Sequence, residues 1–474
     1  MYQLSKEPIM HKLIIALMVL LSTQSLTAQD IAGKWSGKLT IHGTRLTVSF
    51  NVSEDENGYR TTMDSPDQGV KDIPVTTTLN ESFIVFEVPM AGITYEGVHK
   101  DDSLMVGTFK QNNQDFPLNL SKQLIEENVA PRPQEPTKPY PYISENVTFE
   151  NPQAKIKLAG TLTFPPDKGS FPAVILISGS GPQNRDEELM GHKPFLVLSD
   201  YLTRNGIAVL RFDDRGFGES TGDFSSATTA DFAGDVASAI AFLKSRNEVD
   251  TTNIGLIGHS EGGLIAPMVA AESADVGFIV LMAGSGIRGD KLLLLQEELI
   301  ERVMGASEAE IENLLQTNSK IFDVIVSTGD DLDLKSILRR TLEESLNDDS
   351  ANNIPEGMTK EEFISAQVNL FTSPWVTYFL RYDPSEALEK VTCEVLAING
   401  EKDLQVPPKE NLSAIKDALK RGGNNRVTVK EYEGLNHLFQ ESATGSPMEY
   451  SVIEQTIAPL VLQDVTDWII GQMK

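Results

Sequence analysis

The feature that most constrains the fold is a change of pattern near residue 143. Beyond it, short and nearly continuous apolar runs alternate with amphipathic stretches such as residues 229–246. The apolar runs lie at 173–177, 208–212, 254–257, 278–282 and 395–398. Such runs are typical of strands in a parallel sheet that is covered on both faces. The alternation with helical periodicity predicts an α/β domain with right-handed βαβ units over residues 143–474.

One connection in this domain is too long for an ordinary loop. After the run that ends at Met282, the next run begins near Glu394, and the segment at about 287–387 is rich in helix-forming residues. The periodicity predicts helices at 292–302, 308–316, 334–346 and 359–371. Because a long insertion in a compact domain is usually a lid, we expect a helical cap over the carboxyl edge of the sheet.

Residues 30–122 have a different pattern, in which short alternating runs are separated by turn residues. Strands are predicted at 38–42, 45–52, 75–79, 83–88, 103–110 and 116–120, which favours a small all-β, barrel-like domain. The opening Gly33-Lys34-Trp35 resembles the start of lipocalin-like barrels, although a core tryptophan that seals one end of a small barrel is the preferred explanation. Residues 123–142 are rich in proline and are expected to form a semi-rigid linker.

The first 29 residues have the pattern of a secretory signal peptide. Lys12 precedes an apolar run at 13–21, and Ala28 ends a stretch of small and polar residues. The apolar run is too short to span a bilayer, so we expect a secreted or periplasmic protein without a stable membrane anchor. The formal net charge of -28 argues against a nucleic-acid partner. Cys393 is the one cysteine and is expected to be a small buried side chain rather than a reactive thiol.

A possible nucleophile lies in the sequence Gly258-His259-Ser260-Glu261-Gly262. This Gly-x-Ser-x-Gly motif follows the apolar run at 254–257 and precedes an apolar helix at 264–272. The two glycines permit a sharp turn from strand to helix, which is the setting of a nucleophile elbow. The turn leaves Ser260 at a helix N-terminus, where free N–H groups favour developing negative charge.

A serine nucleophile needs a base, and the chain has six histidines. His11 belongs to the signal peptide, His42 and His99 belong to the β domain, and His259 is expected to point away from its neighbour Ser260. His437 follows the predicted strand at 427–432 and is the preferred base, with His192 as the alternative.

The acid that orients the base should lie between the serine and the histidine in the chain. Gly400 ends the predicted strand that starts at 395, and Asp403 follows it closely. This carboxylate would hold the imidazole in one tautomer, with Glu401 as the rival acid.

Together these motifs resemble the α/β-hydrolase superfamily, and most closely its secreted bacterial serine esterases of the serine aminopeptidase-like and dienelactone-hydrolase-like group. The resemblance covers residues 143–474 and implies the α/β-hydrolase fold, whose base lies in the loop after the last strand. Further segments agree: Ser178-Gly179-Ser180-Gly181-Pro182 at the oxyanion turn, residues 211–220 after the next strand, and Ser373-Pro374-Trp375 in the cap.

The resemblance also implies an oxyanion hole made by the backbone N–H of Glu261 and that of Ser180 or Gly181. Arg185 and Asp186 lie just past the oxyanion turn and would line the substrate pocket or form an ion pair at its rim. Trp375 is a further expected pocket residue. The loop at 213–218 is expected to be structural, with Arg215 in a buried ion pair.

These observations predict acyl transfer on a small-molecule ester with a short acyl chain, without metal or other cofactor. A serine peptidase, either an aminopeptidase or prolyl-oligopeptidase-like, is the alternative, with Glu297, Glu298 and Glu301 as possible partners of a substrate's amino group. A binding module that has lost activity is the less favoured reading, because every position of the triad is filled. The role of the β domain and the oligomeric state are left open.

Overall fold

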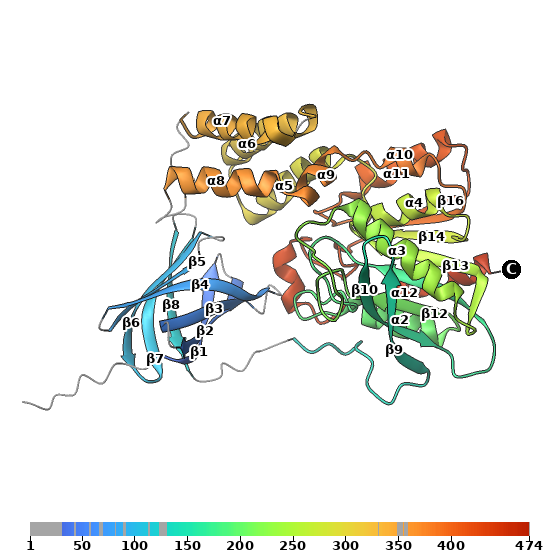
Figure 1. Ribbon diagram of the computed structural model, residues 1–474, viewed down its shortest axis with the longest axis horizontal. Coiled ribbons are helices and arrows are strands. Elements are labelled where there is room, and N and C mark those ends of the chain that lie inside the picture. The colour runs from blue at the N-terminus through green and yellow to red at the C-terminus, as the bar shows by residue number, and fades with distance from the viewer. Residues whose placement is uncertain are drawn as a thin grey trace, which may run out of the picture.

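The chain contains two separate sheets, one formed before the proline-rich segment and one after it (Figure 1). The computed structural model describes residues 31–41, 44–55, 58–65, 70–80, 82–88, 92–111, 114–122, 130–329, 331–347, 354 and 359–473. The predicted signal peptide, with His11, and also His42 therefore lie outside the described residues. Among the described residues, no helix has the length and apolar character needed to cross a membrane.

The first sheet is a closed antiparallel barrel. Its strands are β1 (Gly33–Ile41), β2 (Thr44–Asp55), β3 (Gly58–Ser65), β4 (Val70–Asn80), β5 (Phe83–Val88), β6 (Ile93–Asp101), β7 (Leu104–Gln111) and β8 (Gln114–Ser121). Large side chains fill its interior, among them Phe50 and Phe86, whose stacked rings lie 4.4 Å apart. Trp35 is fully buried and its Nε1 donates a hydrogen bond to the carbonyl of Ile31 at 2.7 Å. The tryptophan thus packs as a core residue of the barrel.

The sequence predicted most of the barrel strands but missed β3 and β6. Both strands carry polar residues, and β6 ends in the polar run of residues 99–101, which is typical of a turn. Gly97 of β6 leaves room for the ring of Tyr95, because a Cβ atom at Gly97 would lie 2.6 Å from the Tyr95 hydroxyl. A strand in a barrel needs an inward apolar residue only at every second position, and here small residues further weaken the pattern.

The second sheet has eight strands in the order β16-β15-β14-β13-β11-β12-β10-β9. The strands are β9 (Ile143–Asn151), β10 (Ile156–Phe164), β11 (Phe171–Ile177), β12 (Ala208–Phe212), β13 (Val249–His259), β14 (Phe278–Met282), β15 (Glu394–Gly400) and β16 (Val427–Tyr432). The strands from β11 to β16 run parallel, as predicted, whereas β9 and β10 add an antiparallel hairpin at one edge.

Helices cover both faces of this sheet, which explains why its central strands are apolar throughout. Helices α3 (Thr229–Lys244), α4 (Gly262–Glu272) and α11 (Pro408–Arg421) pack on one face. Helices α2 (Pro194–Arg204) and α12 (Pro459–Gln472) pack on the other. A short 3-10 helix, η4 (Pro447–Val452), precedes α12. The fold is therefore the predicted doubly wound α/β sheet.

The long insertion is helical, as predicted. It contains α5 (Gly289–Met304), α6 (Glu308–Ser327), α7 (Asp331–Asn347), α8 (Lys360–Phe371), α9 (Pro374–Arg381) and the short α10 (Ser385–Leu388). Figure 1 shows α5 to α9 gathered as a separate layer beside the sheet. Leu292 of α5 and Phe379 of α9 pack against Leu264 of α4 and against Val406. Through these contacts the cap packs against α4, the helix that follows Ser260.

Candidate active site

Ser260 lies at a strained turn between β13 and α4. Its φ angle is 54°, a left-handed value that non-glycine residues rarely adopt. A Cβ atom at Gly258 would lie 1.9 Å from the carbonyl oxygen of Gly262, and one at Gly262 would lie 2.1 Å from that of Ile177. The backbone therefore approaches too closely for any other residue at either position. This is the geometry expected of a nucleophile elbow, with the serine presented at the end of the strand.

His437 and Asp403 meet beside this turn. The Nδ1 atom of His437 donates a hydrogen bond to Asp403 Oδ2 at 2.8 Å, and both side chains are buried. Asp403 Oδ1 accepts hydrogen bonds from the backbone N–H groups of Gln405 and Val406, each at 2.8 Å. With Nδ1 engaged, Nε2 is the ring nitrogen of His437 that remains for the cavity, which Ser260 and His437 both line.

The alternative base and acid have other roles. His192 is fully buried, with Nε2 2.8 Å from the carbonyl of Tyr450 and Nδ1 3.0 Å from the hydroxyl of Thr456. Burial lowers the pKa of His192 to about 4. Glu401 is exposed and accepts a hydrogen bond from the backbone N–H of Gly434 at 2.8 Å. Neither residue lines the cavity that Ser260 and His437 share.

The predicted oxyanion turn packs directly against the elbow. A Cβ atom at Gly179 would lie 3.1 Å from the Cβ atom of Ser260. The hydroxyl of Ser178 donates a hydrogen bond to the carboxylate of Asp214 at 2.9 Å, which stabilises the position of the turn. Ser180 lines the cavity together with Ser260, whereas Gly181 follows with a φ of 91° and does not.

The side chain of Glu261 connects the elbow to the cap. It is buried, and its Oε1 accepts hydrogen bonds from Thr229 Oγ1 at 2.6 Å and from Trp375 Nε1 at 2.8 Å. Burial raises the pKa of this carboxyl. Trp375 belongs to α9, lines the cavity and stacks on Phe379 with ring centroids 5.0 Å apart. Sequence reasoning had included Trp375 but gave no partner for it.

Arg185 and Asp186 do not line the cavity, so their expected role in substrate binding is not supported by their position. Arg185 forms ion pairs with Asp213 and Glu219, each at 2.6 Å, and Asp186 forms an ion pair with Arg211. Both side chains therefore take part in ion pairs, but with other residues and not with each other. Arg215 forms the expected buried ion pair, with Asp235 as its partner at 2.7 Å.

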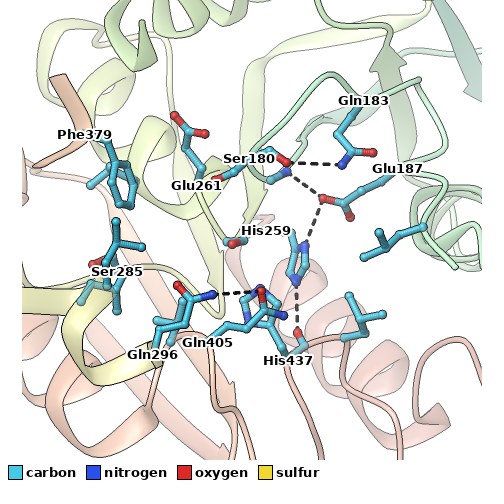
Figure 2. Close-up of a pocket in the computed structure, with 18 of the residues that line it drawn as sticks. Ser180, Gln183, Glu187, His259, Glu261, Ser285, Gln296, Phe379, Gln405 and His437 are labelled. Atoms are coloured by element: carbon cyan, nitrogen blue, oxygen red, sulfur yellow. Dashed lines mark hydrogen bonds and ion pairs between the residues drawn. The ribbon is translucent and has the colours of Figure 1, made fainter. Parts of the chain in front are cut away.

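Several cavity residues were not identified from the sequence. The cavity has a volume of about 370 Å³, and Figure 2 shows polar side chains on two of its sides. Apolar walls come from Leu189, Pro194, Leu264, Leu292, Leu293, Phe379, Val406 and Leu438, and polar groups from Gln183, Glu187, Ser285, Gln296 and Gln405. Most of these residues come from loops and from the cap, whereas Pro194 begins α2 and Leu264 belongs to α4, and no local motif marks the set. In the described part of the chain, no group of three His, Cys, Asp or Glu residues is arranged to hold a metal ion.

Comparison with known proteins gives one family and several relatives. The family described as "Serine aminopeptidase, S33" matches residues 194–332. Esterase EstD of Thermotoga maritima is 26% identical over 315 residues, which cover 66% of this chain and 65% of that protein. The chain thus spans slightly less than two thirds of the length of EstD. An uncharacterized 31.7 kDa protein of Escherichia coli is 28% identical over 248 residues, covering 52% of this chain and 79% of that protein.

Solved structures show weaker similarity. The Pyrococcus furiosus esterase Pf2001 has a TM-score of 0.42 and 15% identity, covering 70% of this chain and 94% of that one. Est1E from Butyrivibrio proteoclasticus, solved with ferulic acid, has a TM-score of 0.40 and 17% identity, covering 69% of this chain and 99% of that one. These scores are too low to bear on the site. The sheet topology and the Gly-x-Ser-x-Gly turn are those of the α/β-hydrolase fold, and the sequence is similar to part of the serine aminopeptidase family and to an esterase.

Proposed function

We propose that the protein is a serine carboxylic-ester hydrolase with Ser260 as nucleophile, His437 as base and Asp403 as the acid that orients the base. The single observation that carries this proposal is the shared geometry of the three residues. Ser260 is held at a left-handed turn in the wall of the cavity that His437 also lines, and Asp403 fixes the imidazole from the far side. The similarity to an esterase supports the same reaction class.

The reaction proceeds in two steps. His437 Nε2 takes the proton of Ser260 as its Oγ attacks the ester carbonyl carbon, and backbone N–H groups of Glu261 and Ser180 stabilise the oxyanion. The tetrahedral intermediate collapses, His437 gives the proton to the departing alkoxide, and an alcohol leaves. A water molecule then attacks the acyl-enzyme with His437 as base, which releases the acid and restores Ser260.

The cavity favours small uncharged esters with a short acyl chain. Its volume is about 370 Å³ and most of its wall is apolar. The carboxyl groups of Glu187 and Glu261 are buried and already hydrogen-bonded to other residues. An uncharged substrate therefore meets no uncompensated charge in this site.

A serine aminopeptidase is the second candidate, because the matching family carries that description. Such an enzyme needs a carboxylate to bind the amino group of its substrate. The glutamates considered for this role have other partners: Glu297 accepts a hydrogen bond from Asn318, and Glu298 pairs with Arg302. Together with Glu301 they lie outside the cavity wall. The site geometry therefore favours the esterase over the aminopeptidase.

We further propose that the chain is exported to the periplasm or the medium and cleaved near residue 29. Lys12, the apolar run at 13–21 and the small residues up to Ala28 support this proposal. The N-terminal sequence of the protein purified from its natural source would test it. A mature chain that begins near Asp30 is expected, and a mature protein that retains the first 29 residues would contradict it.

The reaction is tested with p-nitrophenyl esters from acetate to octanoate, using the wild type and Ser260→Ala. We expect the wild type to prefer the short esters and the variant to lose turnover by about 10³-fold or more. Amino-acid p-nitroanilides, assayed in parallel, separate the esterase from the aminopeptidase. Hydrolysis of anilides without hydrolysis of esters by the folded wild type would overturn the esterase proposal.

A further inference from the structure

We propose that Glu187 and His259 form a buried ion pair that positions the base and the oxyanion turn together. The inference rests on the proposed function, because it assigns positioning residues to that same reaction. Sequence reasoning placed His259 in the elbow without a role and did not consider Glu187. Neither residue is needed for the chemistry of the triad itself.

A chain of hydrogen bonds connects the pair to both parts of the site (Figure 2). His259 Nε2 lies 3.0 Å from the backbone carbonyl oxygen of His437, and His259 Nδ1 lies 3.0 Å from Glu187 Oε1. The same Glu187 oxygen accepts the backbone N–H of Gly179 at 2.8 Å. One carboxylate and one imidazole thus join the oxyanion turn, the elbow and the loop of the base.

The acceptors define the protonation of His259. A carbonyl oxygen only accepts hydrogen bonds, so Nε2 must carry a proton to bond to His437. A carboxylate at Nδ1 favours a proton there as well. Burial alone would lower the pKa of His259, but the charge and hydrogen bond of Glu187 outweigh it, so the pKa is raised. The side chains of His259 and Glu187 are only 8% and 5% exposed, which leaves each as the main partner of the other's charge.

The backbone around the pair indicates a fixed arrangement. Glu187 has a φ of 51°, a left-handed value, and its N–H bonds to the carbonyl of Asn184 at 2.9 Å. Strained backbone of this kind persists only where the surrounding structure holds it, and it is concentrated at functional sites. His259 directly precedes Ser260, and Gly179 is so close to Ser260 that an added Cβ atom at Gly179 would lie 3.1 Å from that of Ser260. A shift of either member of the pair would therefore move groups that act on the reacting carbonyl.

The kinetic test compares Glu187→Gln, His259→Gln and the double variant with the wild type on a short p-nitrophenyl ester. Glu187→Gln keeps the shape of the side chain and an acceptor for Gly179 but removes the charge. We expect kcat to fall about 10- to 100-fold in each single variant while KM stays within about threefold. Inhibition by a short alkylboronic acid, which mimics the tetrahedral intermediate, should weaken by the same factor as kcat. The kcat of the double variant should equal that of the less active single variant, because each substitution already breaks the same ion pair.

Glu188→Gln is the matched control, since Glu188 is the next residue, is exposed and accepts a hydrogen bond from Asn184. Its kinetic constants should equal those of the wild type. Folded Glu187 and His259 variants with an unchanged kcat, or with a higher KM alone, would overturn the positioning role. Additive losses in the double variant would also overturn the claim that the two residues act together.

A second measurement does not depend on ester hydrolysis, and its main result needs only the wild type. In ¹⁵N-histidine-labelled wild type at neutral pH, both ring nitrogens of His259 should carry protons, and one should be lost in Glu187→Gln. A neutral His259 in the wild type would overturn the ion pair even in an active esterase. A wild type that contains the imidazolium but hydrolyses no ester would instead contradict the proposed function.

Discussion

The Nδ1 atom of His437 lies 2.8 Å from Asp403 Oδ2, and solvent reaches almost nothing of either side chain. Two backbone N–H groups hold the other carboxylate oxygen, so Asp403 cannot rotate without losing them. The imidazole is thereby fixed in the tautomer whose Nε2 accepts a proton. Asp403 is therefore the carboxylate whose loss should disturb the tautomer of His437.

Asp403→Asn should lower kcat by about 10³- to 10⁴-fold with little change in KM, because the amide favours the wrong tautomer of His437. Steady-state kinetics on a short p-nitrophenyl ester measure the effect. Glu401→Gln is the control, since Glu401 is exposed and its carboxylate accepts a hydrogen bond from the N–H of Gly434, and its kcat should stay within about threefold of the wild type. Equal losses in both variants would speak against Asp403 as the orienting acid.

Trp375→Phe should reduce kcat/KM about tenfold. The substitution keeps an aromatic ring to stack on Phe379 but removes the N–H that bonds to the buried carboxyl of Glu261. Losing a partner at a buried polar group costs about 1–3 kcal/mol, which corresponds to this range. Trp468→Phe is the matched control, because Trp468 belongs to α12, is partly buried and packs against Phe278. Unaltered kinetics in Trp375→Phe would show that the link between cap and elbow has no part in turnover.

Gly262→Ala should destabilise the protein by about 2 kcal/mol or more and abolish most activity, because the added Cβ atom would lie 2.1 Å from the backbone carbonyl of Ile177. The free energy of unfolding in urea measures the effect. Gly471→Ala introduces the same methyl group near the end of α12, where nothing lies within 4 Å. It should be neutral or stabilise the protein by up to about 1 kcal/mol. A fully stable and active Gly262→Ala protein would be incompatible with the elbow geometry.

The buried His192 should make the protein less stable in mild acid. Burial lowers its pKa to about 4, whereas an exposed histidine titrates near pH 6.5. As pH falls from about 6.5 to about 4, the unfolded chain binds a proton that the folded chain does not, so stability falls by up to about 3 kcal/mol. The pH dependence of unfolding should therefore be shallower in His192→Gln than in the wild type over this window. Parallel curves for the two proteins would refute this account of His192.

Cys393 should react slowly with thiol reagents in the folded protein. Burial raises the pKa of its thiol from 9.0 to about 11, so the reactive thiolate is about a hundredfold scarcer at neutral pH than for an exposed cysteine. Reaction with a disulfide reagent at pH 8, followed by absorbance, should be slow in buffer and fast in urea. The structure shows Cys393 as partly buried, and equally fast reaction in both conditions would show that the fold does not protect its thiol.

Parts of the fold that depend on two-sided burial were predictable from the sequence. β12 and β14 are covered on both faces, so every residue of either strand is buried and the apolar runs are unbroken. β9 has solvent on one face, and exposed residues alternate with buried ones along it. Its hairpin with β10 was missed for that reason. The cap helices α5 to α8 were recognised because each has helical periodicity of its own, whereas the shorter α9 and α10 were missed.

The site divides in the same way. Ser260 could be identified because its motif is local, and Asp403 and His437 because each follows a predicted strand. The partners of His259 and Trp375 could not, because Glu187 is 72 residues from His259 and Glu261 is 114 residues from Trp375. Arg185 was assigned to the pocket by its closeness to the oxyanion turn, yet its guanidinium bonds to Asp213 instead. Closeness to a motif in the sequence therefore predicts where the backbone of a residue lies, but it does not predict the ion-pair partner of its side chain.

The central claim is that Ser260 forms a covalent bond with the acyl group, and it is tested most directly by trapping. Diethyl p-nitrophenyl phosphate forms a stable adduct with an activated serine, so it reports the nucleophile without knowledge of the natural substrate. Intact-mass analysis should show one diethylphosphoryl group per active chain, peptide mapping should place it on Ser260, and Ser260→Ala should remain unlabelled. Labelling of another residue, or an esterase that stays active and unlabelled, would contradict the account.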